Sequence, residues 1–516
     1  MTADAVADLV HGRRTGPARR QAKYPAHRIP PRSICEEDSG RVHTGQPEYA
    51  DDTLTLKFTE HYGDDLRYTA AWGQWSKWNG RTWKPDTTLH IFNLAREICR
   101  KESATCEDER LAHRIASAQT ITAVERLARA DRRHAATVEQ WDSNPWVLNT
   151  PGGIVDLRTG KLRDAMREDY CSKMTAVAPG GECPRWLAFL ARITDGNQEL
   201  QSFMQRMAGY ALTGETREHA LFFLYGTGAN GKSVFLNTIS GLMADYATTA
   251  STETFIDSKN QNHPTDLASL RGARLVTAIE TEEGRRWSES RLKALTGGDR
   301  IAARYMRQDF FQFVPQFKLL VAGNHKPGLR SVDEAIRRRF NLIPFNVTIP
   351  PEERDLELAD KLKVEWGGIL QWAIDGCLQW LKDGLSAPET VTAATGAYLA
   401  EEDTISRWIE DCCEVKKPLW TPATELFNSW RRWADSNQEP AGKQKEFSLA
   451  LESRGYVSKR QRVEASKNPL RGFAGIGIVP DVPGQSVSPV TRARERTKQY
   501  DAAHAAHEPN DGMLVV

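Results

Sequence analysis

The residues best suited to chemistry form one glycine-rich stretch, Gly226-Thr227-Gly228-Ala229-Asn230-Gly231-Lys232-Ser233. Glycines adopt backbone angles that a Cβ forbids, so successive N–H groups can turn inward onto one anion. In the pattern G-x-x-x-x-G-K-S, we expect the Lys232 ammonium to reach the β- and γ-phosphates and the Ser233 hydroxyl to bind Mg²⁺. The stretch therefore predicts a phosphate-binding loop, with ATP and Mg²⁺ as cofactors.

The segments on either side of this stretch predict the elements that position it. The apolar run 221–225 precedes it and indicates a buried strand, while 234–239 continues as a helix. The positive end of that helix dipole would face the phosphates. From about 216 to 346, strand-like and helix-like segments alternate, which predicts an α/β fold with a parallel sheet.

Three acidic residues, Glu280, Glu282 and Glu283, end the next β-rich run, 274–283. In extended geometry Glu280 and Glu282 point to the same side, so both belong near the carboxyl edge of a parallel sheet. We expect Glu280 first, with Glu282 close by, to hold the metal and orient water for hydrolysis. Thr281 separates the two acids, and their division of labour stays open. An exposed acidic loop is the alternative, and for Glu283 it is the better interpretation.

Two further motifs follow in chain order. Asn324 ends the apolar run 317–324, where an amide can hydrogen-bond a γ-phosphate or the attacking water, although such residues also occur in ordinary turns. Arg337, Arg338 and Arg339 precede the strand-like run 340–345. A guanidinium here can stabilise charge on a transferring phosphoryl group, and a solvated helix face is the alternative.

Together these motifs resemble superfamily 3 helicases of the AAA+ kind, specifically the C-terminal portion of phage and plasmid primase-helicases, which are related to the poxvirus helicase-primase. The resemblance covers roughly residues 145–480 and rests on the stretches 226–233, 274–287, 293–313, 317–327 and 333–345. It implies a homo-hexameric ring that translocates on single-stranded or forked DNA during replication. It assigns Lys232 and Ser233 to Walker A, Glu280 to Walker B and Asn324 to sensor 1. An arginine finger from the neighbouring subunit is expected at Arg338 or Arg339, with Arg337 less suited.

A hairpin-like segment lies between the acidic strand and Asn324. Its β-prone runs, 301–306 and 310–314, place Arg304, Tyr305 and Arg307 near the tip. Such a hairpin offers charge to phosphates and an aromatic ring to bases or sugars. Similar helicases grip DNA with a hairpin of this kind, which makes these three residues DNA-binding candidates. A surface hairpin with ordinary charges is the alternative.

The C-terminal segment, 418–480, combines two helical patterns with two strand-like runs, which predicts a winged-helix DNA-binding domain. The segment 443–471 contains eight basic and three acidic residues. On a chain of net charge +1, this local excess favours a phosphate-backbone partner. Lys459, Arg460 and Arg462 on the expected wing are the DNA-binding candidates, with a solvated face as the alternative.

The 516 residues predict several domains. Within 72–83, a hairpin around Asn79-Gly80 is expected to place its tryptophans on one buried face, with stacking on unpaired bases as the alternative. The predicted order is listed here: a disordered basic arm (1–45), a small mixed α+β module (46–145), a mostly helical helicase-associated region (146–213), the AAA+ P-loop ATPase domain (214–385), a helical connector (386–417), the winged helix (418–480) and a disordered tail (481–516).

Composition and the absence of certain sequence signals indicate where the protein acts and which partners it needs. No apolar run approaches the roughly 20 residues that span a bilayer, and the N-terminus lacks a secretion signal. The eight cysteines show no zinc spacing, which favours reduced thiols. We therefore expect a protein in the cytoplasm of a prokaryotic host, without membrane contact, that serves a phage, prophage or plasmid. No primase motif is present, so a separate primase is the expected partner for priming.

Two alternatives stay open. The first is an initiator or regulator that binds DNA and uses ATP to assemble, without processive unwinding. The second is a small-molecule P-loop kinase, which shares the phosphate loop but needs an acceptor pocket and no basic tail.

Overall fold

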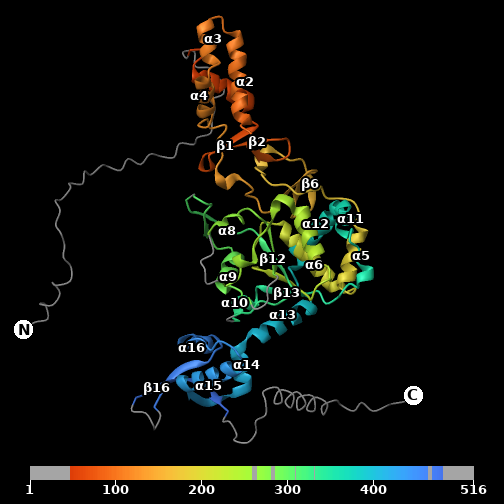
Figure 1. The fold of residues 1–516 in the computed structure, drawn as a ribbon, viewed down its shortest axis with the longest axis vertical. Helices are drawn as coiled ribbons and strands as arrows, with labels where there is room; N and C mark the ends of the chain where they lie inside the picture. Colours follow the sequence, from red (N-terminus) through yellow and green to blue (C-terminus); the bar gives the residue numbers. More distant parts are fainter. Residues whose placement is uncertain are drawn as a thin grey trace, which may run out of the picture.

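The computed structural model describes residues 47–257, 264–280, 285–307, 309–329, 332–462 and 468–479. The predicted arm (1–45) and tail (481–516), and the acids Glu282 and Glu283, lie outside these ranges. In Figure 1 the described chain forms three parts in sequence order: a narrow N-terminal module, a central α/β body and a C-terminal unit that follows α13. Among the helices of the described residues, none combines the length and apolar character that a membrane crossing requires.

The N-terminal module joins four helices to a small antiparallel sheet in the order β1-β2-β3. Its elements are α1 (Asp51–Tyr62), β1 (Leu66–Thr69), η1 (Ala70–Trp72), β2 (Gln74–Trp78), β3 (Trp83–Pro85), α2 (His90–Thr105), α3 (Glu109–Ile115), α4 (Ala118–Ala128) and η2 (Val138–Gln140). The helical pattern from 112 onward is divided between α3 and α4, because the Ser117 side chain accepts a hydrogen bond from Thr120 N and starts a new helix.

The predicted tryptophan hairpin is present, with Trp78 opposite Trp83 across the turn. The expectation of one shared face is wrong. Trp75 packs against α1, α2 and α4, whereas Trp78 and Trp83 pack with Trp141 in a separate cluster. Trp75 and Trp78 are three residues apart on one strand, and the two-residue period of a strand puts such positions on opposite faces. Trp72 lies in η1 and is 41% exposed.

The next region, 146–213, contains a second antiparallel sheet, in the order β4-β5-β6, followed by two helices. Its elements are β4 (Val147–Thr150), β5 (Gly153–Asp156), β6 (Lys161–Arg163), η3 (Arg167–Asp169), α5 (Pro184–Ile193) and α6 (Gln198–Leu212). The prediction of a mostly helical region therefore holds for 184–212 alone, because 147–163 form the three strands of the sheet. Pro at the first position of α5 and the Asn197 side chain before α6 account for their starts.

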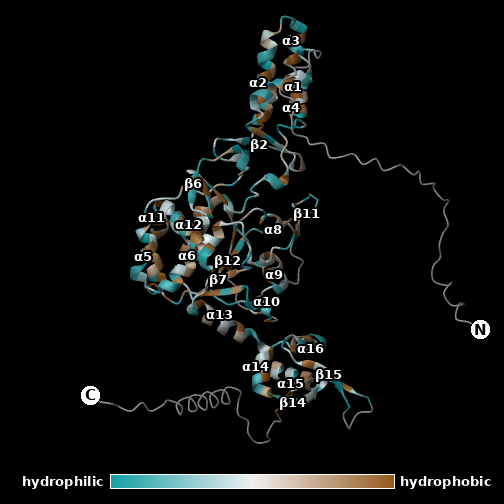
Figure 2. Ribbon diagram, turned by 180° about the vertical axis from the view of Figure 1, so that it is seen from behind, coloured by the Kyte–Doolittle hydropathy of each residue, from teal (hydrophilic) through white to brown (hydrophobic). Residues whose placement is uncertain are grey.

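The central body is built on a five-stranded parallel sheet, as the sequence predicts. Its spatial order is β13-β7-β12-β9-β8, or 5-1-4-3-2 when the strands are numbered by appearance. The strands are β7 (Leu221–Tyr225), β8 (Ala247–Thr249), β9 (Leu275–Glu280), β12 (Lys318–Gly323) and β13 (Phe340–Pro344). These strands are mostly hydrophobic in Figure 2, because both faces of the sheet are covered.

Alternate residues of the central strands enter two separate cores. Phe222 and Leu224 of β7 pack with α5, α6, α7 (Lys232–Met243) and α12 (Trp366–Asp383). Leu221 and Phe223 pack on the other face with α9 (Glu289–Gly297) and α13 (Glu389–Glu402). The remaining elements of this body are η4 (Ala244–Tyr246), η5 (Thr252–Thr254), α8 (Pro264–Ala268), β10 (Ile301–Ala303), β11 (Phe311–Phe313), α10 (Glu334–Arg337), η6 (Pro351–Glu353) and α11 (Leu358–Val364).

The C-terminal unit pairs three antiparallel strands in the order β14-β16-β15 with three helices. Its elements are α14 (Thr404–Cys412), β14 (Cys413–Pro422), α15 (Ala423–Ser436), α16 (Gln444–Ser453), β15 (Val457–Gln461) and β16 (Leu470–Ile478). Two helices followed by a hairpin match the predicted pattern. The helical connector predicted over 386–417 is divided into α13 and α14 at Asp403, whose side chain accepts a hydrogen bond from Ser406 N, and it gives way to β14 at Cys413.

Two buried cations hold the end of α6 against the sheet. The guanidinium of Arg274, 2% exposed, donates from Nη1 to Leu212 O (2.8 Å) and from Nη2 to Val147 O (2.8 Å). The Lys318 ammonium donates to Thr213 O in the residue that follows the helix. Positive charge at a helix C-terminus is favourable, and here it also satisfies carbonyls that the helix leaves unpaired.

Replacing Arg274 with methionine is expected to lower the free energy of unfolding by roughly 3 kcal/mol, because buried carbonyls lose their donor. Thermal unfolding of the full chain measures the effect. Arg96→Met, on the exposed side of α2, is the matched control and should unfold close to the wild type. Equal unfolding temperatures for Arg274→Met and the wild type would contradict this account of the α6 terminus.

Candidate functional site

The phosphate-type loop lies between the central strand β7 and helix α7, as the sequence predicts. Three of its residues have positive φ: Gly228 (112°), Ala229 (49°) and Gly231 (85°). A Cβ at Gly231 would lie 2.6 Å from Ile193 Cγ2, and one at Gly226 would lie 2.4 Å from Phe345 O. Glycine is therefore required at both positions, by backbone angle in the first case and by close approach in the second. The loop is a compact turn fixed by its neighbours α5 and β13.

The Lys232 side chain is 6% exposed and folds back over the loop. Its ammonium donates to Gly226 O (2.6 Å) and to Asn230 Oδ1 (3.0 Å). Asn230 Nδ2 in turn donates to Phe345 O (3.0 Å), which ties the loop to the end of β13. Burial lowers the pKa of Lys232 from its ordinary value. Both acceptors of the ammonium are neutral, so the oxygen of a bound phosphate can replace them with a stronger, charge-assisted contact.

A cavity of ≈ 340 Å³ opens at this loop. It is lined by residues 228–234, which include Lys232 and Ser233, and by Ile279, Ala322, Gly323 and Asn324. Ser233 and Asn324 are both exposed to it. The structure therefore brings the residues predicted for Walker A and sensor 1 to one cavity, although they are about ninety positions apart in the chain.

The ends of three strands align at this cavity. Gly323 of β12 pairs with Tyr225 of β7 on one side and with Glu280 of β9 on the other. The backbone of Glu280 thus reaches the same edge of the sheet as the loop, as expected for neighbouring parallel strands. Its side chain, Thr281 and Glu282 are outside the described part of the chain.

Three consecutive arginines lie at the end of α10 and directly after it, and their side chains have different environments. Arg337 Nη2 bonds Asp403 Oδ2 at 3.1 Å. Arg339 is 8% exposed, and its guanidinium donates to Thr296 Oγ1 (3.1 Å) and Ala335 O (2.8 Å). Arg338 is exposed, and its guanidinium has no hydrogen-bond or ion-pair partner within the described ranges. Neither Arg338 nor Arg339 lines the cavity of its own chain.

The expected hairpin is present but shorter than the pattern suggests. Ile301 pairs with Phe313, and the strands end at Ala303 and Phe311, so the candidate DNA-binding residues lie in the connecting loop. The Arg304 guanidinium lies over the Phe310 ring at 5.0 Å. The Tyr305 ring stacks on Phe311 at 5.3 Å and its hydroxyl donates to Ala268 O (3.3 Å).

All three candidate residues of this loop, Arg304, Tyr305 and Arg307, are exposed, and Arg307 has a φ of 61°. Their positions leave two guanidinium groups and one phenol ring accessible at the tip. The ring of Tyr305 is held by its stacking and hydroxyl contacts, whereas Arg307 lies beyond them at the far end of the loop.

Ion pairs connect α9, the helix before the hairpin, to α10, and α10 to the C-terminal unit. Lys293 of α9 bonds Asp333, which also caps α10 by accepting a hydrogen bond from Ile336 N. Although burial raises the pKa of Asp333, the hydrogen bond from Lys293 and those from backbone N–H groups hold it below its ordinary value. At the other end of α10, buried Asp403 bonds both Arg337 and Arg454. α9, α10 and the residue that follows α16 are therefore joined by ion pairs through Asp333 and Asp403.

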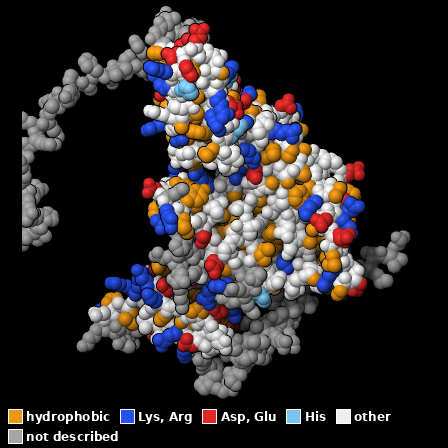
Figure 3. Space-filling model, turned by 45° about the horizontal axis from the view of Figure 1, so that its top comes forward, with side chains coloured by type: hydrophobic (Ala, Val, Ile, Leu, Met, Phe, Trp, Pro, Cys, Tyr) orange, Lys and Arg blue, Asp and Glu red, His pale blue; other side chains and the backbone are white. Residues whose placement is uncertain are grey.

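The basic excess of the C-terminal unit is partly used within the fold. Arg454 bonds Asp403, and Arg471 bonds Glu452 at 2.7 Å. Lys459, Arg460 and Arg462, in contrast, are exposed on or next to the edge strand β15. Lys and Arg side chains gather at one end of this unit in Figure 3. The predicted wing residues are thus accessible, as are Lys443 and Lys445 at the start of α16.

Two residues of the site have no signal in the sequence. Asn230 occupies a variable position of the loop pattern, and its role as the clamp between Lys232 and Phe345 depends on where β13 ends. In the sequence, Asp403 is an ordinary acidic residue within a helical pattern, and its two arginine partners are distant in the chain.

Two family models match parts of the chain. Residues 56–195 match the family described as D5 N terminal like, and residues 224–339 match a family of unknown function, DUF5906. The first match begins at residue 56, well before residue 145, where the resemblance noted in the sequence starts. The N-terminal module therefore belongs to the region that this family model covers.

Curated relatives are viral. The chain is 24% identical over 324 residues to "Putative helicase L207/L206" of Acanthamoeba polyphaga mimivirus, which covers 57% of this chain and 34% of that protein. It is also 24% identical over 321 residues to "Putative helicase 022R" of Frog virus 3 (isolate Goorha), which covers 58% of this chain and 32% of that protein. The chain spans about a third of the length of these relatives. Phage or plasmid origin and a prokaryotic host stay predictions.

Among solved structures, the chain is similar to the "A form apo structure of NrS-1 C terminal region-CTR", with 9% identity and a TM-score of 0.46. That alignment covers 82% of this chain and 98% of the other. The family match and the viral relatives support a relation of this chain to helicase-primase-like replication proteins.

Proposed function

We propose that this chain is an ATP-dependent DNA helicase with a superfamily 3, AAA+-type core. The observation that carries the proposal is the cavity at the sheet edge, where Lys232, Ser233 and Asn324 meet and where the strand ending in Glu280 is in register. The strand order 5-1-4-3-2 places the loop strand β7 between β13 and β12, so neighbouring strand ends flank the loop on both sides. The viral relatives named as helicases support the same reading.

The residues around the cavity fit Mg²⁺-ATP. The loop N–H groups and the Lys232 ammonium would bind the β- and γ-phosphates, and the Ser233 hydroxyl and the Glu280 carboxylate would hold Mg²⁺. Held there, Mg²⁺ would supply positive charge that offsets the negative charge developing on the phosphate oxygens. Glu280, assisted by Glu282, orients the water that attacks the γ-phosphorus, and Asn324 contacts the γ-phosphate. Cleavage releases ADP and phosphate.

A neighbouring subunit completes this site in the proposed assembly, a homo-hexameric ring. Arg338 is exposed, lacks a partner among the described residues and is absent from the cavity of its own chain, which are the properties of a group that acts on another subunit. Arg339 is bonded inside its own subunit, so we assign the finger to Arg338. The Lys293–Asp333 pair connects α10, beside this arginine, to α9, which precedes the hairpin.

DNA contacts are proposed at two places. The loop with Arg304, Tyr305 and Arg307 engages single-stranded DNA, and the C-terminal unit acts as a winged helix whose exposed Lys459, Arg460 and Arg462 bind backbone phosphates. Asp403 joins the C-terminal unit to α10, because it bonds Arg454 and also Arg337, the residue before the proposed finger.

The test is ATP hydrolysis with and without single-stranded DNA, together with unwinding of a forked duplex. The proposal predicts hydrolysis that DNA stimulates and unwinding that needs ATP. Hydrolysis indifferent to DNA would favour a small-molecule kinase. DNA binding and ATP-driven assembly without strand separation would favour an initiator, and either result would contradict the helicase assignment.

Replacing Glu280 with glutamine is expected to lower the rate of ATP hydrolysis about 10²-fold while ATP still binds, because the amide keeps the shape but cannot take a proton from water. A fluorescent ATP analogue measures binding, and phosphate release measures hydrolysis. Glu352→Gln, on exposed η6, is the control and should hydrolyse ATP at the wild-type rate. A Glu280→Gln protein that separates strands as fast as the wild type would rule out this role.

A further inference from the structure

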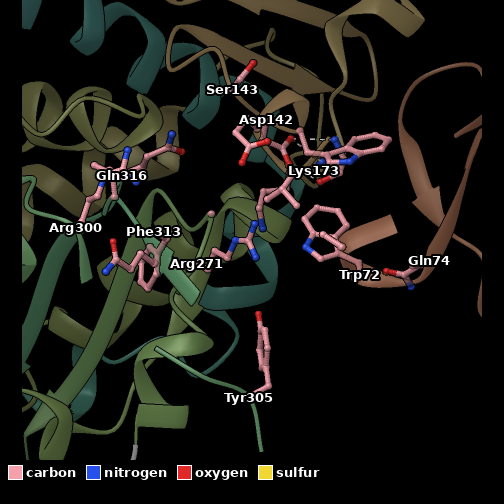
Figure 4. A pocket seen from close by; sticks show the side chains of 18 residues that line it. Trp72, Gln74, Asp142, Ser143, Lys173, Arg271, Arg300, Tyr305, Phe313 and Gln316 are labelled. Carbon is pink, nitrogen blue, oxygen red and sulfur yellow. Dashed lines mark hydrogen bonds between the residues drawn. The ribbon is translucent and has the colours of Figure 1, made fainter. Parts of the chain in front are cut away.

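A second, larger cavity of ≈ 970 Å³ lies between the N-terminal module and the central body. From the module it is lined by Trp72, Gln74 and Trp141, and from the body by Arg271, Arg300 and Tyr305. Figure 4 shows the Arg271 side chain in the middle of this cleft, with Trp72 on the side of the module and Phe313 on the side of the body. Its volume is at the upper end of the range of ligand sites.

Planar groups form a continuous stack across the cleft. The Trp141 and Trp72 rings stack at 6.3 Å with an interplanar angle of 27°. The Arg271 guanidinium lies over the Trp72 ring at 5.3 Å and over the Phe311 ring at 5.1 Å, so it joins the two parts of the molecule. Tyr305 stacks on Phe311 and continues the series into the hairpin loop. Trp72 and Tyr305 are each 41% exposed and offer ring surface to the cleft.

The charges of the cleft favour an anion. Arg300 is exposed and has no hydrogen-bond or ion-pair partner in the described part of the chain, and Arg271 contacts rings instead of carboxylates. Lys173 donates to Asp245 O at 2.9 Å. The acids are Glu139, which is exposed, and Asp142, whose carboxylate already accepts hydrogen bonds from Ser172 and from Lys173 N. Guanidinium groups beside accessible aromatic rings are suited to single-stranded nucleic acid, because the guanidinium groups contact the phosphates while the bases stack on the rings.

We propose that this cleft is a binding site for single-stranded DNA, in which an unpaired base stacks against Trp72 while Arg271 and Arg300 contact phosphates. The inference rests on the proposed helicase function and extends the DNA path from the hairpin loop onto the N-terminal module. Gln74, Gln312 and Gln316 line the same cleft and offer amide groups to base edges. The tryptophans of the module thus divide into two groups, with Trp75, Trp78 and Trp83 in the core and Trp72 at the ligand.

The first test measures binding of a fluorescein-labelled oligothymidylate to full-length Trp72→Ala and Arg271→Ala proteins. Each substitution is expected to weaken binding about 10-fold, and Trp72→Phe should retain most of the affinity because it keeps a stacking face. ATP hydrolysis without DNA should stay at the wild-type rate. Leu127→Ala on α4 is the matched control, since Leu127 is also 41% exposed but does not line the cleft.

A second measurement uses the wild-type protein, so it does not depend on whether a variant folds. Photo-crosslinking to an oligonucleotide that contains bromodeoxyuridine, followed by trypsin, is expected to label the peptide 68–77, which contains Trp72. Labels confined to the C-terminal unit would overturn the proposal.

The outcomes separate this inference from the proposed function. A wild-type protein that binds and hydrolyses with DNA stimulation, with Trp72→Ala and Arg271→Ala equal to it, would refute the cleft alone. A lower unfolding temperature with unchanged DNA affinity would show that the stack merely joins the two parts of the fold. A wild-type protein that fails to bind the oligonucleotide would refute both.

Discussion

The Arg338→Ala protein is expected to lose ATP hydrolysis by about 10³-fold or more while it still binds ATP, because a guanidinium that stabilises the transferring phosphoryl group acts on the transition state. Arg338 is exposed and unpaired among the described residues, so its removal should leave the unfolding temperature unchanged. Phosphate release and a fluorescent ATP analogue measure the two effects. The loss should be equal with and without DNA.

The neighbouring arginines are the controls. Arg337→Ala breaks the bond to Asp403 and should change the hydrolysis rate far less than Arg338→Ala. Arg339→Ala removes donors to Thr296 and Ala335 and should mainly lower the unfolding temperature. If Arg339→Ala abolishes hydrolysis at unchanged stability while Arg338→Ala remains active, the finger is Arg339 and the buried contacts seen here must open in the assembly.

The Lys232→Ala protein is the second case in which a large effect is expected. Its ATP hydrolysis should fall by about 10³-fold, because the Lys232 ammonium is the positive charge that we propose contacts the β- and γ-phosphates. Unwinding should be lost with it, and binding of single-stranded DNA should persist because none of the three proposed DNA sites contains Lys232. Lys363→Ala on α11, which is exposed, is the control and should behave as the wild type.

Stability offers a check on this interpretation. The Lys232 ammonium bonds Gly226 O and Asn230 Oδ1, and alanine leaves both acceptors next to a water-accessible cavity. We therefore expect a small change in unfolding temperature. Unwinding at the wild-type rate by Lys232→Ala would contradict the helicase assignment, since no ATP-driven step would then be needed.

The central fold could be predicted because its signals are local. The apolar run 221–225, the glycine turn and the helix after Lys232 each favour one structure, and the alternation from 216 to 346 requires a parallel sheet. The tryptophan hairpin was only partly predictable from local sequence signals. Its turn was predictable from Asn79-Gly80, but the separation of Trp75 and Trp78 into two cores depends on strand period and on which helices pack against each face.

The site was predictable to the extent that it follows strand ends. Asn324 and Glu280 come after apolar runs, and parallel pairing brings such positions to one edge. The choice between Arg338 and Arg339 was not predictable, because adjacent residues of one type differ in burial through contacts with Thr296 and Ala335. The cleft between Trp72 and Arg271 was equally hidden, since its two sides come from segments that pack together in the folded chain.

The account depends on an ATP site shared by two subunits, and mixing two inactive proteins tests this most directly. The Lys232→Ala protein lacks the lysine of the phosphate-binding loop but keeps the arginine finger. The Arg338→Ala protein lacks the finger but keeps the complete phosphate-binding loop. In a mixed ring, an Arg338→Ala subunit beside a Lys232→Ala subunit forms one complete site. We predict that the mixture hydrolyses ATP while each protein alone does not, and that hydrolysis by the wild type rises with protein concentration. A mixture as inactive as its parts, with wild-type activity per subunit constant on dilution, would contradict the shared site.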